Sequence, residues 1–377
     1  MLLLVGREGF EPSTPSLSEK CSNQLSYRPR RDKNILSYVS IIMSLMRTRP
    51  HVITIGGGTG TFVVLSGLKD YPVELSAIVT MTDSGGSTGK LRDQLGVLPP
   101  GDLRQALVAL SESEEIWRKL FTYRFDSGDF DGHSFGNLLI SALEKITGSN
   151  QEAVNYAMRI LQTKGQVIPV TFSNCSLCAK YQDGAVVKGE SNIEEYKFPK
   201  SPISHVYLSP KALMNLEAKH TLERADYIIF GPGDLYTSIL PNILVEGMST
   251  VLANTTAKKI FVVNLMTRTG QTDNFKVSDF VNELSKYMGE EYLDYILINN
   301  AKHNPKLLKI YKEVDNAIPV EDDILGNSYK KAKVIRTDLL SSERYAQSSS
   351  DQVKRSLIRH DPVKLANAIL DIIDSRF

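Results

Sequence analysis

The chain has 377 residues, 42% hydrophobic and 23% charged, which excludes global disorder and fits one large α/β domain or two to three smaller ones. Lys and Arg number 44 against 43 Asp and Glu, so the net charge of +1 argues against a nucleic-acid binder with a broad basic field. No apolar run approaches the roughly 18 residues of a membrane span. Three cysteines are too few for a disulfide framework, and we expect a cytoplasmic protein.

Residues 1–45 differ from the rest of the chain, because they show no sustained helical or strand period. Their stretch G-R-E-G-F-E-P-S-T-P resembles the translated opposite strand of a transfer-RNA gene. Gly9 to Pro12 can be encoded by codons that contain the TTCGAA core of a T-arm. We interpret this segment as a mis-annotated leader, with a disordered leader as the alternative. Met43 or Met46 is then the expected start, and the segment is assigned no function.

From residue 46 to the end, short apolar runs alternate with helical patterns, which is typical of a parallel sheet with crossover helices. We therefore expect a single Rossmann-like α/β domain with a mostly parallel sheet and flanking helices. The expected strands are 51–55, 74–81, 226–230, 259–265, 294–299 and 333–336, and the expected helices are 61–69, 102–110, 134–146, 238–247 and 361–373. A small β-rich insertion is expected at about 166–207, where Asp183-Gly184 predicts a hairpin turn.

The first candidate binding loop directly follows the first predicted strand and opens a helix. Its residues are Gly56, Gly57, Gly58, Thr59, Gly60 and Thr61. Glycines let the backbone approach a phosphate, and the N–H groups at a helix start attract an anion. The alternative is a tight turn without a ligand, although a mere turn does not need so many glycines. The dinucleotide pattern G-x-G-x-x-G fails at Thr61, which disfavours a nicotinamide cofactor.

A second glycine-rich loop follows the second predicted strand. Its candidate ligand-binding residues are Asp83, Ser84, Gly85, Lys90 and Arg92. A Walker A loop is excluded, because Ser84 stands where that pattern requires glycine and Leu91 stands where it requires Ser or Thr. We expect a second contact to a phosphate or a sugar, with a solvated surface loop as the alternative.

Three further loops also place glycine beside polar residues at the start of a helix. Their candidates are Asp102, Arg104, His133, Asn137, Gly231, Gly233 and Asp234. Taken alone, Asp102 is a plain helix N-cap and His133 a structural histidine. Loops at the carboxyl ends of parallel strands share one crevice, however, so their number predicts a ligand of nucleotide size.

The remaining chemistry-bearing patterns are weak. Cys175 and Cys178 form a lone C-x-x-C within a predicted strand, where residues three apart point to opposite faces, so we expect neither zinc nor a dithiol. The six histidines are scattered and predict no metal site. The sequence contains no G-x-S-x-G nucleophile elbow and no H-E-x-x-H motif.

Together these motifs resemble the YvcK/CofD family. The motifs on which this resemblance rests are I-G-G-G-T-G, D-S-G-G-S-T-G-K-L-R, P-P-G-D-L-R, G-H-S-F-G-N-L-L, G-P-G-D-L-Y-T-S-I-L-P-N, N-L-M-T-R-T-G-Q-T-D and I-R-H-D-P-V-K-L-A. The second loop is similar to the gluconeogenesis-factor branch, which implies a cytoplasmic UDP-sugar-binding protein that supports cell shape and wall synthesis on gluconeogenic carbon. Such proteins often form homodimers, and cell-wall synthesis proteins are the implied partners. The other branch, 2-phospho-L-lactate transferase, moves a phospholactyl group from a guanosine nucleotide onto a deazaflavin.

The resemblance also implies roles for individual residues. The glycine loops would cradle phosphates, Asp83 and Asn137 would contact hydroxyls, Arg359 would neutralise phosphate charge and Tyr311 would stack on a base. The chain departs from the family pattern at Ser84, where a second acid is usual, and at Lys90, where arginine is usual.

Three functional hypotheses follow. A UDP-sugar-binding regulator without established catalysis comes first. A phospholactate- or phosphoenolpyruvate-type transferase is the alternative, with Asp83 as the one candidate magnesium ligand. An NAD(P) oxidoreductase is third. No resident cofactor is expected with certainty, although the resemblance to the transferase branch leaves magnesium open.

The leader hypothesis predicts that a chain beginning at Met46 melts at the same temperature as the full chain and expresses at least as well. Differential scanning calorimetry of both proteins is the measurement. A loss of several degrees on truncation would show that residues 1–45 stabilise the folded domain.

Overall fold

The structure, a computed structural model, describes residues 49–196, 201–289, 293–342 and 357–375. The interpretation of residues 1–45 as translated transfer-RNA-gene sequence concerns residues outside this part, and it stays a prediction. No helix among the described residues is long and apolar enough to cross a membrane.

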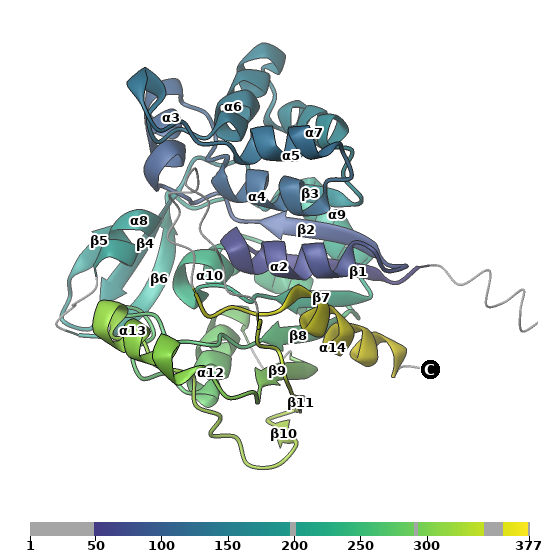
Figure 1. Cartoon of the computed structure of the whole chain (residues 1–377), viewed down its shortest axis with the longest axis vertical. Helices are drawn as coiled ribbons and strands as arrows, with labels where there is room; N and C mark the ends of the chain where they lie inside the picture. Colours follow the sequence, from purple (N-terminus) through teal and green to yellow (C-terminus); the bar gives the residue numbers. More distant parts are fainter. Residues whose placement is uncertain (1–48, 197–200, 290–292, 343–356, 376–377) are drawn as a thin grey trace, which may run out of the picture. The chain divides into compact units, whose positions relative to one another are not determined.

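An eight-stranded sheet with the order β10-β11-β9-β8-β7-β1-β2-β3 forms the centre of the fold (Figure 1). Its strands pair in parallel except for β10 with β11. The strands are β1 (His51–Gly56), β2 (Glu74–Val79), β3 (Gln166–Pro169), β7 (Tyr227–Phe230), β8 (Lys258–Val262), β9 (Tyr295–Asn299), β10 (Ser328–Tyr329) and β11 (Ala332–Thr337). The predicted mostly parallel α/β sheet is therefore confirmed. β3 belongs to the main sheet because it pairs with β2.

The strand order reverses at β1. From β1 the chain moves outward to β2 and β3, and it then returns to the other side of β1 to form β7, β8 and β9. The register pairs Val52 with Tyr227 and Ile55 with Phe230, so the carboxyl ends of β1 and β7 lie next to each other. Such a switch point is where open α/β sheets bind ligands.

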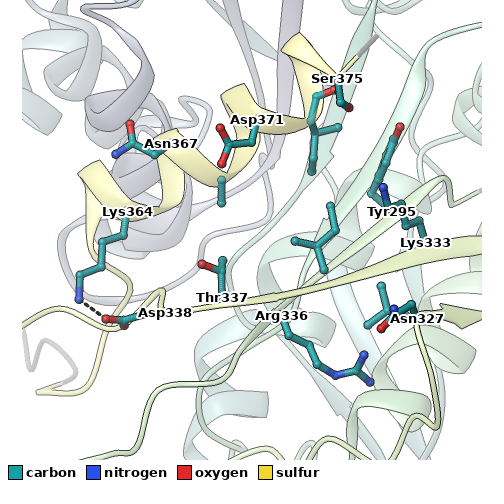
Figure 2. Close-up of a pocket in the computed structure, with 14 residues that line it drawn as sticks. Tyr295, Asn327, Lys333, Arg336, Thr337, Asp338, Lys364, Asn367, Asp371 and Ser375 are labelled. Carbon is teal, nitrogen blue, oxygen red and sulfur yellow. Dashed lines mark hydrogen bonds and ion pairs between the residues drawn. The ribbon is translucent and has the colours of Figure 1, made fainter.

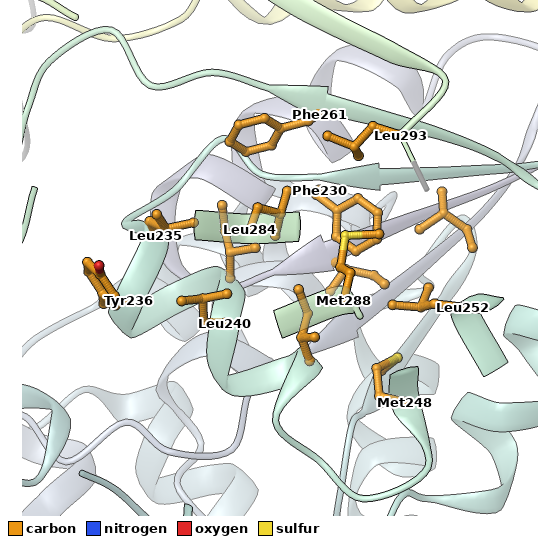
Figure 3. Close-up of a cluster of buried hydrophobic side chains, with 14 of the residues drawn as sticks. Phe230, Leu235, Tyr236, Leu240, Met248, Leu252, Phe261, Leu284, Met288 and Leu293 are labelled. Atoms are coloured by element: carbon orange, nitrogen blue, oxygen red, sulfur yellow. The ribbon is translucent and has the colours of Figure 1, made fainter. Parts of the chain in front are cut away.

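Helices cover both faces of the sheet. One face carries α2 (Gly58–Leu68), α4 (Gly101–Leu110), α7 (Asn150–Leu161) and α14 (Pro362–Asp374), and the other carries α9 (Leu216–Glu223), α10 (Leu240–Ile243), α11 (Met248–Asn254) and α12 (Val277–Met288). Side chains alternate along each strand: Ile229 packs with the first set and Phe230 with the second. Figure 3 shows Phe230 among Leu240, Leu252 and Met288 in the second core.

Further helices and short helical turns connect these elements along the chain. They are α3 (Gly86–Leu95), α5 (Glu115–Thr122), α6 (Phe135–Thr147), α13 (Pro305–Asp315), a 3-10 turn (Gly128–Phe130) and a π-helical turn (Leu235–Ile239). A small antiparallel sheet consists of β4 (Ser176–Tyr181), β5 (Val186–Lys188) and β6 (Ile203–Ser209). The helix α8 (Glu190–Glu195) lies between β5 and β6 in the sequence. β4 and β5 form the hairpin predicted at Asp183-Gly184. Cys175 and Cys178 are buried free thiols, and burial raises the pKa of Cys175 to about 11.

Two predicted helices differ from the structure by more than one residue at an end. The helix expected at 61–69 begins at Gly58, inside the glycine loop. The helix expected at 238–247 corresponds to the end of the π-helical turn and α10, which ends at Ile243, followed by a connection to α11 at Met248. Pro241 in α10 has no N–H to donate, which interrupts the regular hydrogen-bond ladder. Gly247, at a φ of 100°, then begins α11 in a new direction.

The close packing of α2 on α14 generates a prediction. A Cβ at Gly67 would fall inside the contact distance of the Pro362 carbonyl, so Gly67→Ala must push the two helices apart. We expect a loss of about 1–3 kcal/mol in unfolding free energy, measured by urea denaturation. Ser66→Ala is the matched control, because the Ser66 hydroxyl donates only to carbonyls of its own helix. Equal stability of the two variants would contradict the packing.

Candidate functional site

The loops after β1 and β7 touch each other at the switch point. A Cβ at Gly60 would overlap the carbonyl of Pro232, so only glycine permits this approach. The Gly231 N–H donates to the Ile55 carbonyl at 3.1 Å and continues the pairing of the two strands into their loops. The first and last glycine loops predicted from sequence therefore form one backbone surface.

The Asp102 carboxylate lies at the start of α2. Its Oδ1 accepts a hydrogen bond from the Gly58 N–H at 2.7 Å, and the side chain is only 8% exposed. The prediction that Asp102 caps its own helix is wrong. The N-cap of α4 is Pro100, no side chain caps that helix, and Asp102 follows inside its first turn. Asp102 instead caps α2, because the first turn of α4 faces the glycine loop.

Burial gives Asp102 an unusual charge state. Burial first, and the nearby Asp83 carboxylate second, raise the pKa of Asp102 to about 8, although the Gly58 N–H opposes this shift. Asp102 is therefore largely protonated at neutral pH. Asp83 accepts a hydrogen bond from the Gly85 N–H at 2.9 Å and packs against Gly101, at the start of α4.

Two glutamates of α8 reach the same edge. Glu190 accepts the Ser84 N–H at 3.2 Å, and the Ser191 N–H donates to the Ser84 hydroxyl at 3.1 Å. Glu194 accepts the Thr237 hydroxyl at 3.4 Å. The helix of the insertion thus connects the loop after β2 with the loop after β7, and Ser84 takes part in that connection.

The pKa values of both glutamates are also raised. Burial and then Asp83 raise the pKa of Glu190 well above its ordinary value. Burial and then Asp234 raise the pKa of Glu194 to about 7, against the opposing charge of Arg268. The acidic edge therefore carries less negative charge at neutral pH than its composition indicates.

Arg268 follows β8 and lies between two of these carboxylates. Its guanidinium is 3.6 Å from the Asp234 carboxylate and 3.7 Å from that of Glu194, and its side chain remains 44% exposed. Asp234 raises the pKa of Arg268 further, with smaller contributions from Glu194, Asp315 and Tyr311. A permanent cation therefore sits beside the glycine loop after β7.

A buried hydrogen-bond chain connects α4, α6 and α3. Arg104 Nε donates to Asn137 Oδ1 at 2.8 Å, and Asn137 Nδ2 donates to the Ser87 hydroxyl at 3.3 Å. Ser87 Oγ also lies 3.1 Å from His133 Nδ1, and burial lowers the pKa of His133. Arg104, Asn137 and His133 are each at least nine-tenths buried, and these contacts fix the loop after β2.

The other predicted residues lie around the same edge. The Tyr311 hydroxyl on α13 accepts the Ile358 N–H at 3.0 Å, which places Tyr311 beside the segment that carries Arg359. Arg92 donates to Asp93 at 3.1 Å, while Lys90 and Thr59 are exposed. Contacts of these residues with a ligand stay predictions.

A family model described as "2-phospho-L-lactate transferase CofD" matches residues 52–340. The chain belongs to the CofD family. The match spans every strand from β1 to β11 and each of the glycine loops.

Within this family, the chain is similar to relatives named gluconeogenesis factor and to solved structures. A putative gluconeogenesis factor from Thermotoga maritima is 42% identical over 84% of this chain and 98% of the relative. The gluconeogenesis factor of Bacillus subtilis is 39% identical over 87% of this chain and 99% of the relative. A crystal structure of a UPF0052-family protein from Bacillus halodurans aligns with a TM-score of 0.77 at 35% identity, covering 86% of this chain and 99% of that chain.

A hollow of about 630 Å³ lies away from these loops, between α14 and the strands β9 and β11 (Figure 2). An ion pair of 2.7 Å between Lys364 and Asp338 crosses its rim. None of the site residues predicted for this CofD-family chain lines it. Size alone therefore does not identify the binding site.

Sequence reasoning missed three residues of the crevice: Glu190, Glu194 and Arg268. The two glutamates lie more than 100 residues from Ser84 and Asp83, and only the folded insertion brings them there. Arg268 stood in a motif that was noticed, directly after a predicted strand. Its position at the carboxyl end of that strand was the signal that could have identified it.

The buried Asp102 predicts a pH-dependent stability. Folding raises the pKa of Asp102 from 3.8 to about 8, so its contribution is full below the unfolded value and is lost as the pH rises through the folded value. Asp102→Asn retains an acceptor for Gly58 and cannot ionise. Its advantage over the wild type should therefore grow with pH, by about 1.4 kcal/mol per unit of pKa shift.

Urea denaturation at about pH 5 and about pH 9 measures this difference. Asp70→Asn is the matched control and should show the wild-type pH dependence. Asp70 is exposed and follows the C-terminal end of α2, whereas Asp102 contacts its N-terminal end. The same pH dependence in Asp102→Asn and the wild type would contradict a buried, proton-holding Asp102.

Proposed function

We propose that this chain is a gluconeogenesis factor that binds a UDP-sugar in the crevice at the switch point and supports cell shape and cell-wall synthesis in the cytoplasm. The observation that carries the proposal is the contact between the loops after β1 and β7 at the point where the strand order reverses. Nucleotide phosphates bind such backbone surfaces in α/β folds. The names of the relatives support the part of the proposal that calls the chain a gluconeogenesis factor.

We assign the phosphates of the ligand to particular backbone N–H groups at the start of α2. Asp102 takes the Gly58 N–H, so the proposal places phosphate on the next N–H groups of α2, those of Thr59 and Gly60, which have no acceptor inside the helix. The Gly231–Gly233 loop lies beside them. Thr59 is exposed and Gly60 half-buried, which suits contact with a ligand.

We assign the sugar and the base of the ligand to residues around these loops. Asp83 is half-buried and has carboxylate acceptors for sugar hydroxyls. Tyr311 offers a ring for the base, and Arg359, which follows the Ile358 N–H that donates to Tyr311, offers a charge for the phosphates.

The alternative is a 2-phospho-L-lactate transferase, which the name of the family model favours. A magnesium ion would be held by Asp83 together with substrate phosphates, and it would supply positive charge during group transfer. The residues fit this role only in part. Asp102 is largely protonated at neutral pH and so supplies little negative charge for a metal ion. Ser84 is uncharged, and its hydroxyl accepts a hydrogen bond from the Ser191 N–H.

Calorimetry with UDP-N-acetylglucosamine separates the two functions. We expect the wild type to bind without magnesium, and Asp83→Asn to weaken binding by at most about 1.5–3 kcal/mol, the value of one charged hydrogen bond. Asp70→Asn is the control at an exposed carboxylate past the far end of α2.

A parallel assay with a guanosine-linked phospholactate donor and a deazaflavin acceptor tests the alternative. Magnesium-dependent product that disappears in Asp83→Asn would replace the binding function with catalysis. Absence of UDP-sugar binding to the wild type, with or without magnesium, would refute the proposal.

A further inference from the structure

The arginines of the fold differ in how fully their guanidinium groups are used. Arg336 donates to Asp322, to the Gly326 carbonyl at 2.6 Å and to the Ile324 carbonyl at 2.7 Å. Arg104 is buried and donates to Asn137 and to the Phe121 carbonyl. Both are structural arginines whose donors are directed at fixed acceptors of the protein.

Arg268 is held in a different way. Its two carboxylate neighbours, Asp234 and Glu194, lie at 3.6 and 3.7 Å, beyond the 2.7–2.9 Å that is typical of a charge-assisted hydrogen bond. Its side chain is 44% exposed at the carboxyl edge of the sheet. Ion pairs that are this long and this exposed are weak, and a guanidinium presents a fork that matches a phosphate.

Its position completes the phosphate surface. Asp234 is the residue that follows Gly233 and begins the π-helical turn, so Arg268 lies next to the loop that touches Gly60. Tyr311 and Asp315 act on Arg268 from the side of α13. Arg268 thus stands between the glycine loops and the rim that carries Tyr311.

We propose that Arg268 is the anion-binding residue of the crevice, kept in place by Asp234 and Glu194 until the diphosphate of the ligand replaces these carboxylates. The proposal rests on the proposed function for the identity of the ligand, a nucleoside diphosphate sugar. Its anion chemistry can be tested separately. Arg268 was not among the residues predicted from sequence.

Transfer of Arg268 to the ligand has a consequence for Glu194. The charged and titratable groups that face Glu194 are Asp234 after β7, Arg268 after β8, Asp83 after β2, and Asp102 and Glu190. Arg268 alone among them is a cation. When the ligand takes this cation and adds its own negative charge, Glu194, whose pKa is about 7, takes up a proton. Binding is therefore coupled to proton uptake and tightens as the pH falls.

The first experiment uses inorganic pyrophosphate as the probe and measures the shift in melting temperature. We expect a rise for the wild type, a smaller rise for Arg268→Lys and none for Arg268→Gln. The matched control is Arg159→Gln, which removes an arginine that lies over the Tyr156 ring on α7 and should respond as the wild type does. Unchanged stabilisation in Arg268→Gln would overturn the proposal, as would absence of stabilisation in the wild type.

The second experiment uses UDP-N-acetylglucosamine, whose diphosphate diester does not titrate near neutral pH. Calorimetry at pH 7 in buffers of different ionisation enthalpy measures affinity and proton uptake together. Arg268→Gln should lose about tenfold or more in affinity, as expected for one charged hydrogen bond, and its proton uptake should fall. Glu194→Gln should bind more tightly than the wild type, because it removes a competitor for Arg268, and should also take up fewer protons.

These opposite effects on affinity distinguish the proposal from general destabilisation, which would weaken binding in both variants. Equal affinity and equal proton uptake in the wild type and Arg268→Gln would overturn the proposal while the proposed function stands. Arg268-dependent stabilisation by pyrophosphate, without UDP-sugar binding, would refute the proposed function and leave the anion site.

Discussion

The hydrogen bond from the Gly58 N–H to Asp102 is the contact on which the rest of the crevice depends. It joins the start of α2 to the first turn of α4 and leaves a carboxyl buried at the positive end of a helix. Asp102 also lies near Asp83, so this contact stands beside the loop after β2. The glycine loop is therefore not an isolated phosphate cradle. Part of its capacity to bind anions is used to hold the protein together.

The second constraint is charge. Asp83, Asp102, Asp234 and the glutamates of α8 come from separate segments and meet where an anionic ligand is proposed to bind. Fully ionised, they would repel a diphosphate. Burial raises the pKa values of Asp102, Glu190 and Glu194, so this edge carries less negative charge than if every carboxyl ionised at its ordinary pKa. Protonation and Arg268 together make an acidic edge compatible with an anion.

Local sequence patterns predicted the sheet because each strand is a short apolar run bounded by turn residues, as in Tyr227–Phe230. Local patterns also predicted the glycine loops, because glycine and polar residues directly follow the apolar runs. They could not predict that Asp102 caps α2, because that depends on the direction in which α4 approaches. They could not place Glu190 next to Ser84, since this contact spans 106 residues and requires the folded insertion. The single helix expected at 238–247 ends at Ile243, and the chain turns at Gly247, whose φ of 100° suits glycine.

The hydrogen bonds of Ser87 argue for binding over nucleophilic chemistry. A serine 3.1 Å from a histidine nitrogen has the spacing of a nucleophile and its base. The lone pairs of this hydroxyl, however, accept from the Ser134 N–H at 3.4 Å and from Asn137 at 3.3 Å. Its proton therefore points to His133 Nδ1, which makes the ring a neutral acceptor on that side. Ser87 is only 4% exposed, and burial together with these accepted hydrogen bonds disfavours attack on a substrate. The pair rigidifies the loop that carries Asp83, and a rigid, preorganised loop is what a binding protein requires.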